Sequence, residues 1–255
     1  MNQNLHKMNF LNLNRVISTS LLLLLFLSVK AQIKVAEWNY PVRPGTEQWK
    51  QLDSFSERLN VFNIPESILS EMTTENLVET CLNYPWWILI TSRDNNQAGY
   101  NYLKSVFNGF RELENRQDAG IELLKVYGKM IPDSVMNLET LVKQGMFCFQ
   151  FTFIEVLLSQ PDILKNMDDE YLKSLIRKTV SVYEGKTVAF DKYYYYGISS
   201  TCLILVRVLS KNSYPEYIRL LEKYPELKRL DETGTSGNLE LLEQIVIEAN
   251  RIFNL

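Results

Sequence analysis

Acidic side chains come closest to forming a catalytic set in this sequence. The chain carries one histidine, His6, so the rest of the sequence cannot supply a Ser-His-Asp or Cys-His mechanism or a histidine metal ligand. Pairs of carboxylates can act as acid and base without histidine, as in glycoside hydrolysis. The candidate groups are Glu112 and Glu114 with Asp118, Asp168 with Asp169 and Glu170, and Asp231 with Glu232. Acids at helix starts or on solvated helix faces give the same pattern, and this structural interpretation stays open.

Two aromatic clusters are the candidate ligand-binding residues. Their members are Trp86, Trp87, Tyr193, Tyr194, Tyr195 and Tyr196. Aromatic rings with a polar tip suit proteins, peptides and sugars as partners. Successive side chains point in different directions on a helix or a strand, so four consecutive tyrosines cannot all face a core. We expect at least one of these tyrosines to be exposed, near the edge of Trp86 or Trp87. The alternative is that both clusters seal contacts between helices.

Glu155 and Arg207 are each the lone charge in an otherwise apolar helical segment. Charged side chains are seldom buried without a partner. We therefore expect these two residues to pair with each other or to point outward. A role in ligand binding is the alternative.

The cysteines and the net charge exclude several other classes of site. Cys81, Cys148 and Cys202 lie inside apolar helical patterns without metal-ligand spacing. We expect them to be buried as small hydrophobic residues, and one disulfide with a leftover thiol is the alternative. The sequence has no glycine-rich phosphate loop, and a net charge of −3 provides no basic surface for nucleic acid. It therefore predicts no cofactor, no metal site and no nucleic-acid partner.

Residues 1–31 have the pattern of a secretory signal peptide. A basic start without acids leads into the apolar run 21–27, and Val29-Lys30-Ala31 suits cleavage before Gln32. An uncleaved anchor is the alternative. Beyond this segment the longest apolar run, 146–158, is shorter than the ~20 residues that a membrane span requires. We expect an exported protein, periplasmic or secreted, with no membrane span after signal removal.

The remaining chain predicts one all-α domain. Within residues 32–45 the apolar side chains of Trp38, Tyr40 and Val42 stand at every second position, with Pro41 and Pro44 between and after them. This pattern suggests a short extended arm. Residues 46–255 show helical periodicity in nearly every segment. The pattern predicts a helix over 46–62, a central helix over 138–159 that is buried on all sides, and a linker over 231–237. The run 86–90 (WWILI) fits either a strand or a helix.

A short pattern occurs twice, 95 positions apart. Ile68, Leu69, Met72, Glu75 and Leu77 match Ile163, Leu164, Met167, Glu170 and Leu172. Each copy predicts a short helix started by proline, then a capping residue and a longer helix. Chance could produce such a match in a helical chain. A true duplication would make the protein a multi-helix array of two stacked helical units, similar to a short α-solenoid.

Several runs resemble a family of uncharacterised secreted bacterial proteins. They are YPVRPGTEQW (40–49), IPESILSEMTTENLVETCLNYP (64–85) and FNGFRELENRQDAG (107–120). The resemblance covers residues 38–130 and implies export and a helical fold. It supplies no activity, cofactor or catalytic residue.

These patterns together favour an exported, non-enzymatic binding or scaffolding module with grooves between its helices. A protein, a peptide or a glycan is the expected partner. The alternative is a carboxylate-dependent hydrolase acting on glycans. Two carboxylates ~5–10 Å apart across one pocket would indicate the enzyme. An exposed aromatic groove would indicate the binding module.

Overall fold

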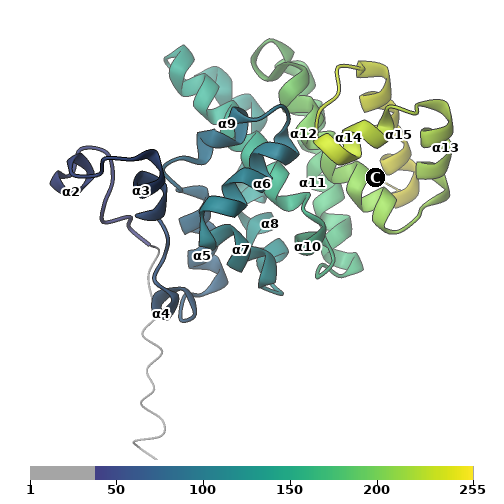
Figure 1. The fold of residues 1–255 in the computed structure, drawn as a ribbon. Coiled ribbons are helices and arrows are strands. Elements are labelled where there is room, and N and C mark those ends of the chain that lie inside the picture. Colours follow the sequence, from purple (N-terminus) through teal and green to yellow (C-terminus); the bar gives the residue numbers. More distant parts are fainter. Residues whose placement is uncertain (1–37, 255) are drawn as a thin grey trace, which may run out of the picture. The chain divides into compact units, whose positions relative to one another are not determined.

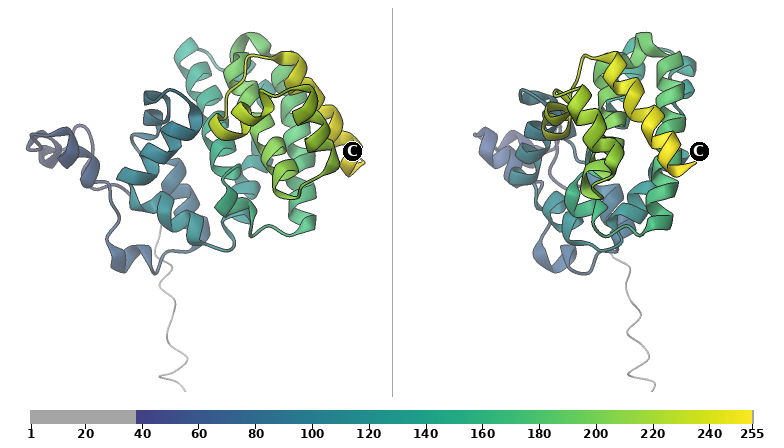
Figure 2. Two further views of the ribbon diagram at one scale, coloured as in Figure 1. Left: turned by 45° about the vertical axis from the view of Figure 1, so that its right-hand side comes forward. Right: turned by 90° about the vertical axis from the view of Figure 1, so that its right-hand side faces the viewer.

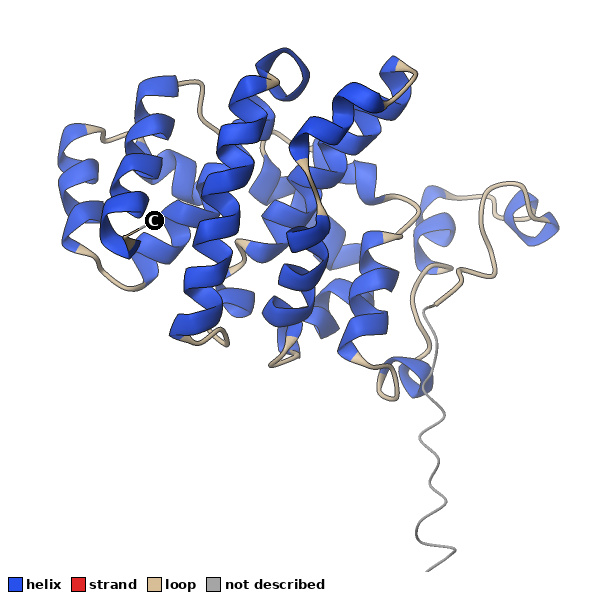
Figure 3. Ribbon diagram, turned by 180° about the vertical axis from the view of Figure 1, so that it is seen from behind, coloured by secondary structure: helices blue, strands red, loops and turns tan. Residues whose placement is uncertain are grey.

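The computed structural model describes residues 38–254, and this part of the chain contains helices and loops but no strand (Figure 3). The expected all-α class is therefore confirmed. The predicted signal peptide, residues 32–37 of the predicted arm and Leu255 lie outside the described residues. In chain order the elements in Figure 1 are α2 (Glu47–Lys50), α3 (Phe55–Asn60), α4 (Glu66–Leu69), α5 (Thr74–Leu82), η1 (Trp87–Ser92), α6 (Asn96–Val106), α7 (Asn108–Asn115), α8 (Ala119–Lys129), η2 (Pro132–Asn137), α9 (Leu141–Leu158), α10 (Pro161–Leu164), α11 (Asp169–Val188), α12 (Phe190–Lys211), α13 (Pro215–Lys223), α14 (Leu227–Thr233) and α15 (Leu239–Phe253).

Side-chain caps fix where many of these helices begin. Thr46, Thr73 and Asp168 cap α2, α5 and α11 as the sequence predicts. The predicted single helix over 46–62 is wrong, because Ser54 starts a second helix there. Ser54 Oγ accepts the backbone N–H of Glu57, and the Glu57 carboxylate accepts the N–H of Ser54, which is a complete capping box.

The described part of the predicted arm lies against α5. Its backbone bends at residues 41 and 42, and it forms no strand. The N–H of Trp38 donates to Thr80 Oγ1 at 2.9 Å, and Tyr40 Oη donates to the Thr80 carbonyl at 2.7 Å. Tyr40 is buried with a positive φ of 42°. These contacts hold this segment against the helices.

Helix α9 is buried on all sides only in its second half. Phe151 to Leu158 are all buried, whereas Leu141 and Val142 are 81% and 76% exposed. The expectation of a helix buried throughout is therefore wrong for residues 141–150. Among the described residues α9 is the one helix long and apolar enough to cross a membrane by length and composition. Its second half packs against α12.

The run 86–90 enters a 3₁₀-helix, η1, that lies directly against α6. Gly99 makes this approach possible, because a Cβ on Gly99 would lie 1.7 Å from the carbonyl oxygen of Ile90. Asn95 then caps α6 by accepting the N–H of Ala98 at 2.8 Å. The close contact places residues 90–95 beside α9 and α12.

Helix α12 has a kink near its start. Tyr194 has φ 50° and ψ −171°, so the helical path breaks there and resumes toward Ile198. Figure 2 shows α13, α14 and α15 gathered around α12 at the C-terminal end, in agreement with their packing. A non-glycine residue with positive φ is uncommon and costs backbone strain.

The predicted linker over 231–237 is a packed segment. Helix α14 continues to Thr233, and Gly234 ends it with a left-handed φ of 73°. The Gly234 carbonyl accepts Asn96 Nδ2 at 3.1 Å, and the Ser236 carbonyl accepts Ser199 Oγ at 2.7 Å. Residues 231–233 therefore belong to α14, whereas residues 234–237 form the predicted loop before α15, and these contacts hold that loop against α6 and α12.

The element boundaries repeat with the displacement seen in the sequence. Helix α4 spans 66–69 and α10 spans 161–164, α5 and α11 begin at 74 and 169, and α9 and α15 end at 158 and 253. Each of these pairs differs by 95 positions. A basic side chain also donates a hydrogen bond to the last carbonyl of each short helix, α4 and α10. Arg116 Nη2 donates to the Leu69 carbonyl at 2.9 Å, and Lys211 Nζ donates to the Leu164 carbonyl at 2.8 Å.

Candidate functional site

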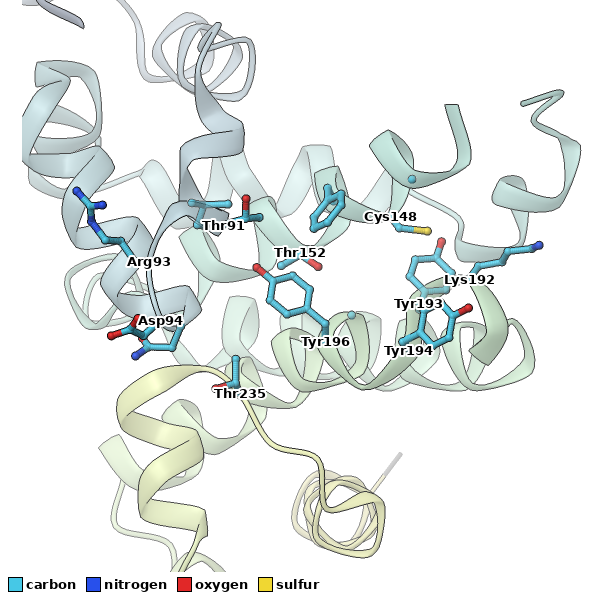
Figure 4. A pocket seen from close by; sticks show the side chains of 15 residues that line it. Thr91, Arg93, Asp94, Cys148, Thr152, Lys192, Tyr193, Tyr194, Tyr196 and Thr235 are labelled. Carbon is cyan, nitrogen blue, oxygen red and sulfur yellow. The ribbon is translucent and has the colours of Figure 1, made fainter. Parts of the chain in front are cut away.

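A pocket of about 580 Å³ lies where η1, α9 and α12 meet (Figure 4). One wall comes from η1 and the loop to α6, a second from residues 145–152 in the middle of α9, and a third from the kinked start of α12. The lining residues are Ile90, Thr91, Arg93, Asp94, Asn95, Gly145, Cys148, Phe149, Thr152, Lys192, Tyr193, Tyr194, Tyr196, Gly197 and Thr235. Its volume falls within the range of small-molecule sites.

The middle of the pocket is mostly apolar and uncharged, and its charged residues lie at the two ends. Figure 4 shows Arg93 and Asp94 at one end and Lys192 at the other. The Arg93 guanidinium lies 3.9 Å from the centroid of the Tyr102 ring and donates to its neighbouring carbonyl at Ser92. Lys192 Nζ pairs with Asp191 at 3.1 Å. Both basic groups therefore have local partners.

Three of the four predicted tyrosines line this pocket. Tyr193 is buried and donates from its hydroxyl to the Pro132 carbonyl at 2.9 Å. Tyr194 and Tyr195 are 59% and 45% exposed, which confirms that at least one ring of the run faces solvent. Tyr195 lies outside the main pocket and, with Tyr196, borders a neighbouring hollow of about 520 Å³.

Among the described residues that line the pocket, Tyr196 is the one whose side chain has a buried polar atom without a hydrogen-bond partner. Its ring packs against Phe149 with centroids 5.9 Å apart, and its hydroxyl is buried without a hydrogen bond. Burial raises the pKa of Tyr196 to about 12. Figure 4 shows the hydroxyl directed across the pocket toward Thr91.

The predicted tryptophans belong to other packing clusters. Trp87 is buried against Phe153, with ring centroids 5.6 Å apart. Trp86 packs against Phe55 and Trp49 at 4.9 and 5.7 Å. Neither tryptophan lines the pocket. Tyr193, Tyr194 and Tyr196 therefore line the pocket, whereas Trp86 and Trp87 pack against aromatic rings of other elements.

A buried ion pair between Glu155 and Lys186 lies beneath the pocket. Lys186 Nζ is 2.8 and 2.7 Å from the two carboxylate oxygens, and both side chains are fully buried. The same ammonium donates to the Gly197 carbonyl at 2.8 Å and to Thr201 Oγ1 at 2.9 Å. Burial lowers the pKa of Lys186, and the Glu155 carboxylate opposes this shift.

Hydroxyl groups complete the shell of Glu155 and connect it to the pocket wall. Tyr127 and Thr201 donate to one carboxylate oxygen at 3.0 and 2.8 Å, and Ser200 donates to the other at 2.6 Å. Burial beside this carboxylate raises the pKa of Tyr127. Ser200 Oγ also lies 3.4 Å from Thr152 Oγ1, which faces the pocket. The network ties α9, α11 and α12 together at the pocket floor.

Sequence reasoning missed Lys186 and gave Glu155 the wrong partner. Lys186 lies four residues after Val182 on the buried stripe of α11, and that spacing is the signal that could have identified it. The expected pairing of Glu155 with Arg207 is wrong. Arg207 is buried elsewhere and donates to Gln97 Oε1 at 2.6 Å and to the Asp231 carbonyl at 2.9 Å.

The predicted carboxylate groups have structural roles. Glu112 binds Arg116 at 2.6 Å, and Glu114 binds Lys104 at 3.0 Å. Asp118 directly precedes α8 but makes no side-chain cap there, and its carboxylate accepts the Thr74 hydroxyl at 2.6 Å. Asp168 caps α11, while Asp231 and Glu232 lie 3.6 and 3.9 Å from Arg207 and Lys228.

Carboxylates line a third hollow, of about 560 Å³, between α10, α12 and α14. Asp162, Asp231 and Glu232 border it, and each has a basic partner within 4 Å. The pocket beside the tyrosines has Asp94 as its single lining carboxylate. Neither hollow therefore presents an unpartnered pair of acids to a substrate.

The cysteines are all free thiols. Cys81 and Cys202 are buried, as predicted, whereas Cys148 is half-buried and lines the tyrosine pocket. Burial raises the pKa of Cys148 above its ordinary value. Cys148 is therefore the one cysteine among the lining residues of the pocket.

Comparison with known proteins gives no family assignment. No family model matches the chain, and no curated protein or solved structure matches it either.

Proposed function

We propose that this protein is an exported, non-enzymatic binding module whose ligand site is the pocket between η1, α9 and α12. The observation that carries the proposal is a mainly apolar pocket of about 580 Å³ lined by three tyrosines and a single carboxylate, Asp94. Pockets of this size and composition are typical of small-molecule sites. A hydrolase with paired carboxylates needs a second acid facing the same space, and the lining supplies none.

A substitution at Gly145 can fill the pocket and so test the proposal directly. A Cβ built on Gly145 meets no atom within 4 Å, although the residue lines the pocket. The substitution Gly145→Phe therefore places a ring in the pocket without a backbone clash. Gly128 provides the matched control, because it is also helical, meets no atom within 4 Å and lies outside the lining. Both substitutions raise helix propensity.

The probe is the uncharged fluorophore 6-propionyl-2-(dimethylamino)naphthalene. We expect its emission to shift to the blue and rise in intensity with wild-type protein and with Gly128→Phe. Gly145→Phe should remove the signal while leaving the circular dichroism spectrum and the melting temperature unchanged or higher. Equal binding to Gly145→Phe and wild type, or no binding to wild type, would reject the pocket as a site for a small apolar ligand.

The proposed scaffold consists of two helical units related by duplication. The 95-residue displacement of helix bounds supports this arrangement, as do Arg116 and Lys211, which bind equivalent carbonyls and are themselves 95 positions apart. Residues 90–95 and 145–152 of the pocket belong to the first unit, and residues 192–197 and 235 belong to the second. Stacked helical repeats commonly bind their partners on a surface to which several repeats contribute.

Export is the second part of the proposal and rests on residues 1–31 of the sequence. Intact-mass analysis of protein recovered from its native host provides the test. We expect the mass of a chain that begins at Gln32. A mass that includes residues 1–31 would reject cleavage before Gln32.

A further inference from the structure

We infer that the pocket takes an uncharged, mainly apolar molecule carrying a hydrogen-bond acceptor, and that Tyr196 Oη is the donor that binds this acceptor. This inference rests on the proposed function of the pocket and adds the chemical class of its ligand. It begins with the unsatisfied hydroxyl of Tyr196. Buried polar groups in proteins almost always have a hydrogen-bond partner, so an unpaired one on a pocket wall indicates a missing partner.

Most of the other buried tyrosines show the usual arrangement; the buried hydroxyl of Tyr84 also lacks a partner, but Tyr84 does not line this pocket. The hydroxyls of Tyr100 and Tyr127 donate to Glu114 and Glu155, and Tyr193 donates to the Pro132 carbonyl. Tyr193 and Tyr196 both line the pocket, but only the Tyr193 hydroxyl is satisfied by the protein. An acceptor atom of a ligand in the pocket would therefore give the Tyr196 hydroxyl the hydrogen-bond partner that the Tyr193 hydroxyl already has.

The free proton of the Tyr196 hydroxyl favours an acceptor on the ligand. Thr91 Oγ1 donates its proton to the Ile88 carbonyl at 2.9 Å, and Thr152 Oγ1 lies 3.4 Å from the Ser200 hydroxyl. The proton of Tyr196 has no acceptor among the described residues. A phenol donates strongly to a carbonyl or ether oxygen, so an acceptor group satisfies the site with one bond.

The distribution of charge favours an uncharged ligand. Lys192 is paired with Asp191, the Arg93 guanidinium lies over Tyr102, and the middle of the pocket is formed by aliphatic, aromatic and hydroxyl groups. An ionic group placed there would lose its hydration without gaining a counter-ion. A molecule with an apolar body and one neutral acceptor meets no such penalty.

The test compares two competitors that differ only in the acceptor. 2-Acetylnaphthalene has a carbonyl, and 2-ethylnaphthalene has a similar shape without one. Each displaces the propionyl-naphthalene probe from the wild type, from Tyr196→Phe and from Tyr195→Phe. Tyr195→Phe is the matched control, because it removes a neighbouring hydroxyl from outside the main pocket.

We expect the wild type and Tyr195→Phe to prefer the acetyl compound by about five- to tenfold, the usual value of one hydrogen bond. Tyr196→Phe should bind both compounds equally and melt at the same or a higher temperature, because it removes an unsatisfied buried hydroxyl. Equal binding of the two compounds by the wild type would overturn the role of Tyr196 while leaving the pocket as a ligand site. A preference that persists in Tyr196→Phe would do the same. Failure of both compounds to bind the wild type would reject the proposed function itself.

Discussion

The ammonium of Lys186 and the carboxylate of Glu155 form an ion pair of 2.7 Å at a point where neither side chain has any exposed surface. They come from α11 and α9, and the Lys186 ammonium also holds the Gly197 carbonyl of α12. Gly197 lines the pocket a few residues after the kink at Tyr194. The ion pair is therefore part of the support that shapes the pocket wall.

Removing one partner of this pair should destabilise the protein strongly. Lys186→Met leaves the Glu155 carboxylate buried without its cation, and we expect the free energy of unfolding to fall by about 3–5 kcal/mol. Glu155→Gln should cost a similar amount, and the double variant Glu155→Gln with Lys186→Met should cost less than the sum of the two. Urea unfolding monitored by circular dichroism measures all three.

The surface pair Lys165–Asp162 is the control for this cycle. Its atoms lie 2.6 Å apart, but both side chains are more than half exposed. Lys165→Met should change the free energy of unfolding by about 0–1 kcal/mol. Equal losses for Lys186→Met and Lys165→Met would contradict the structural importance assigned to the buried pair.

Arg116 and Lys211 should contribute unequally although they occupy corresponding positions. Arg116 donates to the carbonyls of both Leu69 and Met72, whereas Lys211 donates to the carbonyl of Leu164. We expect Arg116→Met to lower the free energy of unfolding by about 1–2 kcal/mol and Lys211→Met by about 1 kcal/mol or less. Chemical denaturation provides the measurement, with the exposed Lys125→Met as the control. A larger loss for Lys211→Met than for Arg116→Met would contradict this ranking.

Local sequence patterns predicted most of the helices because helical periodicity and caps depend on neighbouring residues. Thr73 and Asp168 could be identified as caps from the sequence because each accepts an N–H three residues later. The division of 46–62 was missed because its apolar spacing continues across Ser54, while the capping box that interrupts it depends on Glu57.

The site was less predictable because its important features depend on contacts between distant segments. The tyrosine run was identifiable as a surface element, but the kink at Tyr194 was not. Nothing in the local sequence of Lys186 identifies Glu155, 31 positions earlier, as its partner. The unsatisfied hydroxyl of Tyr196 likewise depends on packing against Phe149 in another helix.

Buried tyrosines should make the fold sensitive to alkaline pH. Burial raises the pKa of Tyr196 and Tyr183 to about 12 and raises those of Tyr100 and Tyr127 as well. The unfolded chain releases these protons near pH 10 while the folded chain keeps them, so folded-state stability falls as pH rises through 10 toward 12. Each fully buried group, such as Tyr100 or Tyr127, contributes a loss of up to about 1.4 kcal/mol per pH unit within that window, and the partly exposed Tyr183 contributes less.

Tyrosinate absorbance at 295 nm and urea unfolding, measured together from pH 8 to 12, check this expectation. The absorbance of the buried tyrosines should appear only as the protein unfolds. A stability that stays constant from pH 9 to 12 would contradict the burial of these groups.

Cys148 should be the thiol that reports on occupancy of the pocket. Cys81 and Cys202 have no exposed surface, whereas Cys148 is half-buried and lines the pocket. We expect Ellman's reagent to label one thiol rapidly in the folded protein and all three after denaturation in guanidinium. Cys148→Ser should remove the rapid phase. Because burial raises the pKa of Cys148, the rate should keep rising with pH beyond the range in which an exposed cysteine levels off.

Ligands and side chains that fill the pocket should slow this labelling. Gly145 lies three residues before Cys148 on the same helix, and both line the pocket, so Gly145→Phe should reduce the rate several-fold whereas Gly128→Phe leaves it unchanged. Saturating 2-acetylnaphthalene should protect Cys148 in the wild type to a similar degree. Rapid labelling of Cys81 or Cys202 at the same rate would indicate that the reagent enters through unfolding, because those two thiols are reachable only when the core opens. Labelling of Cys148 that neither the ring at position 145 nor the ligand slows would show that the thiol is reached by a route other than the pocket.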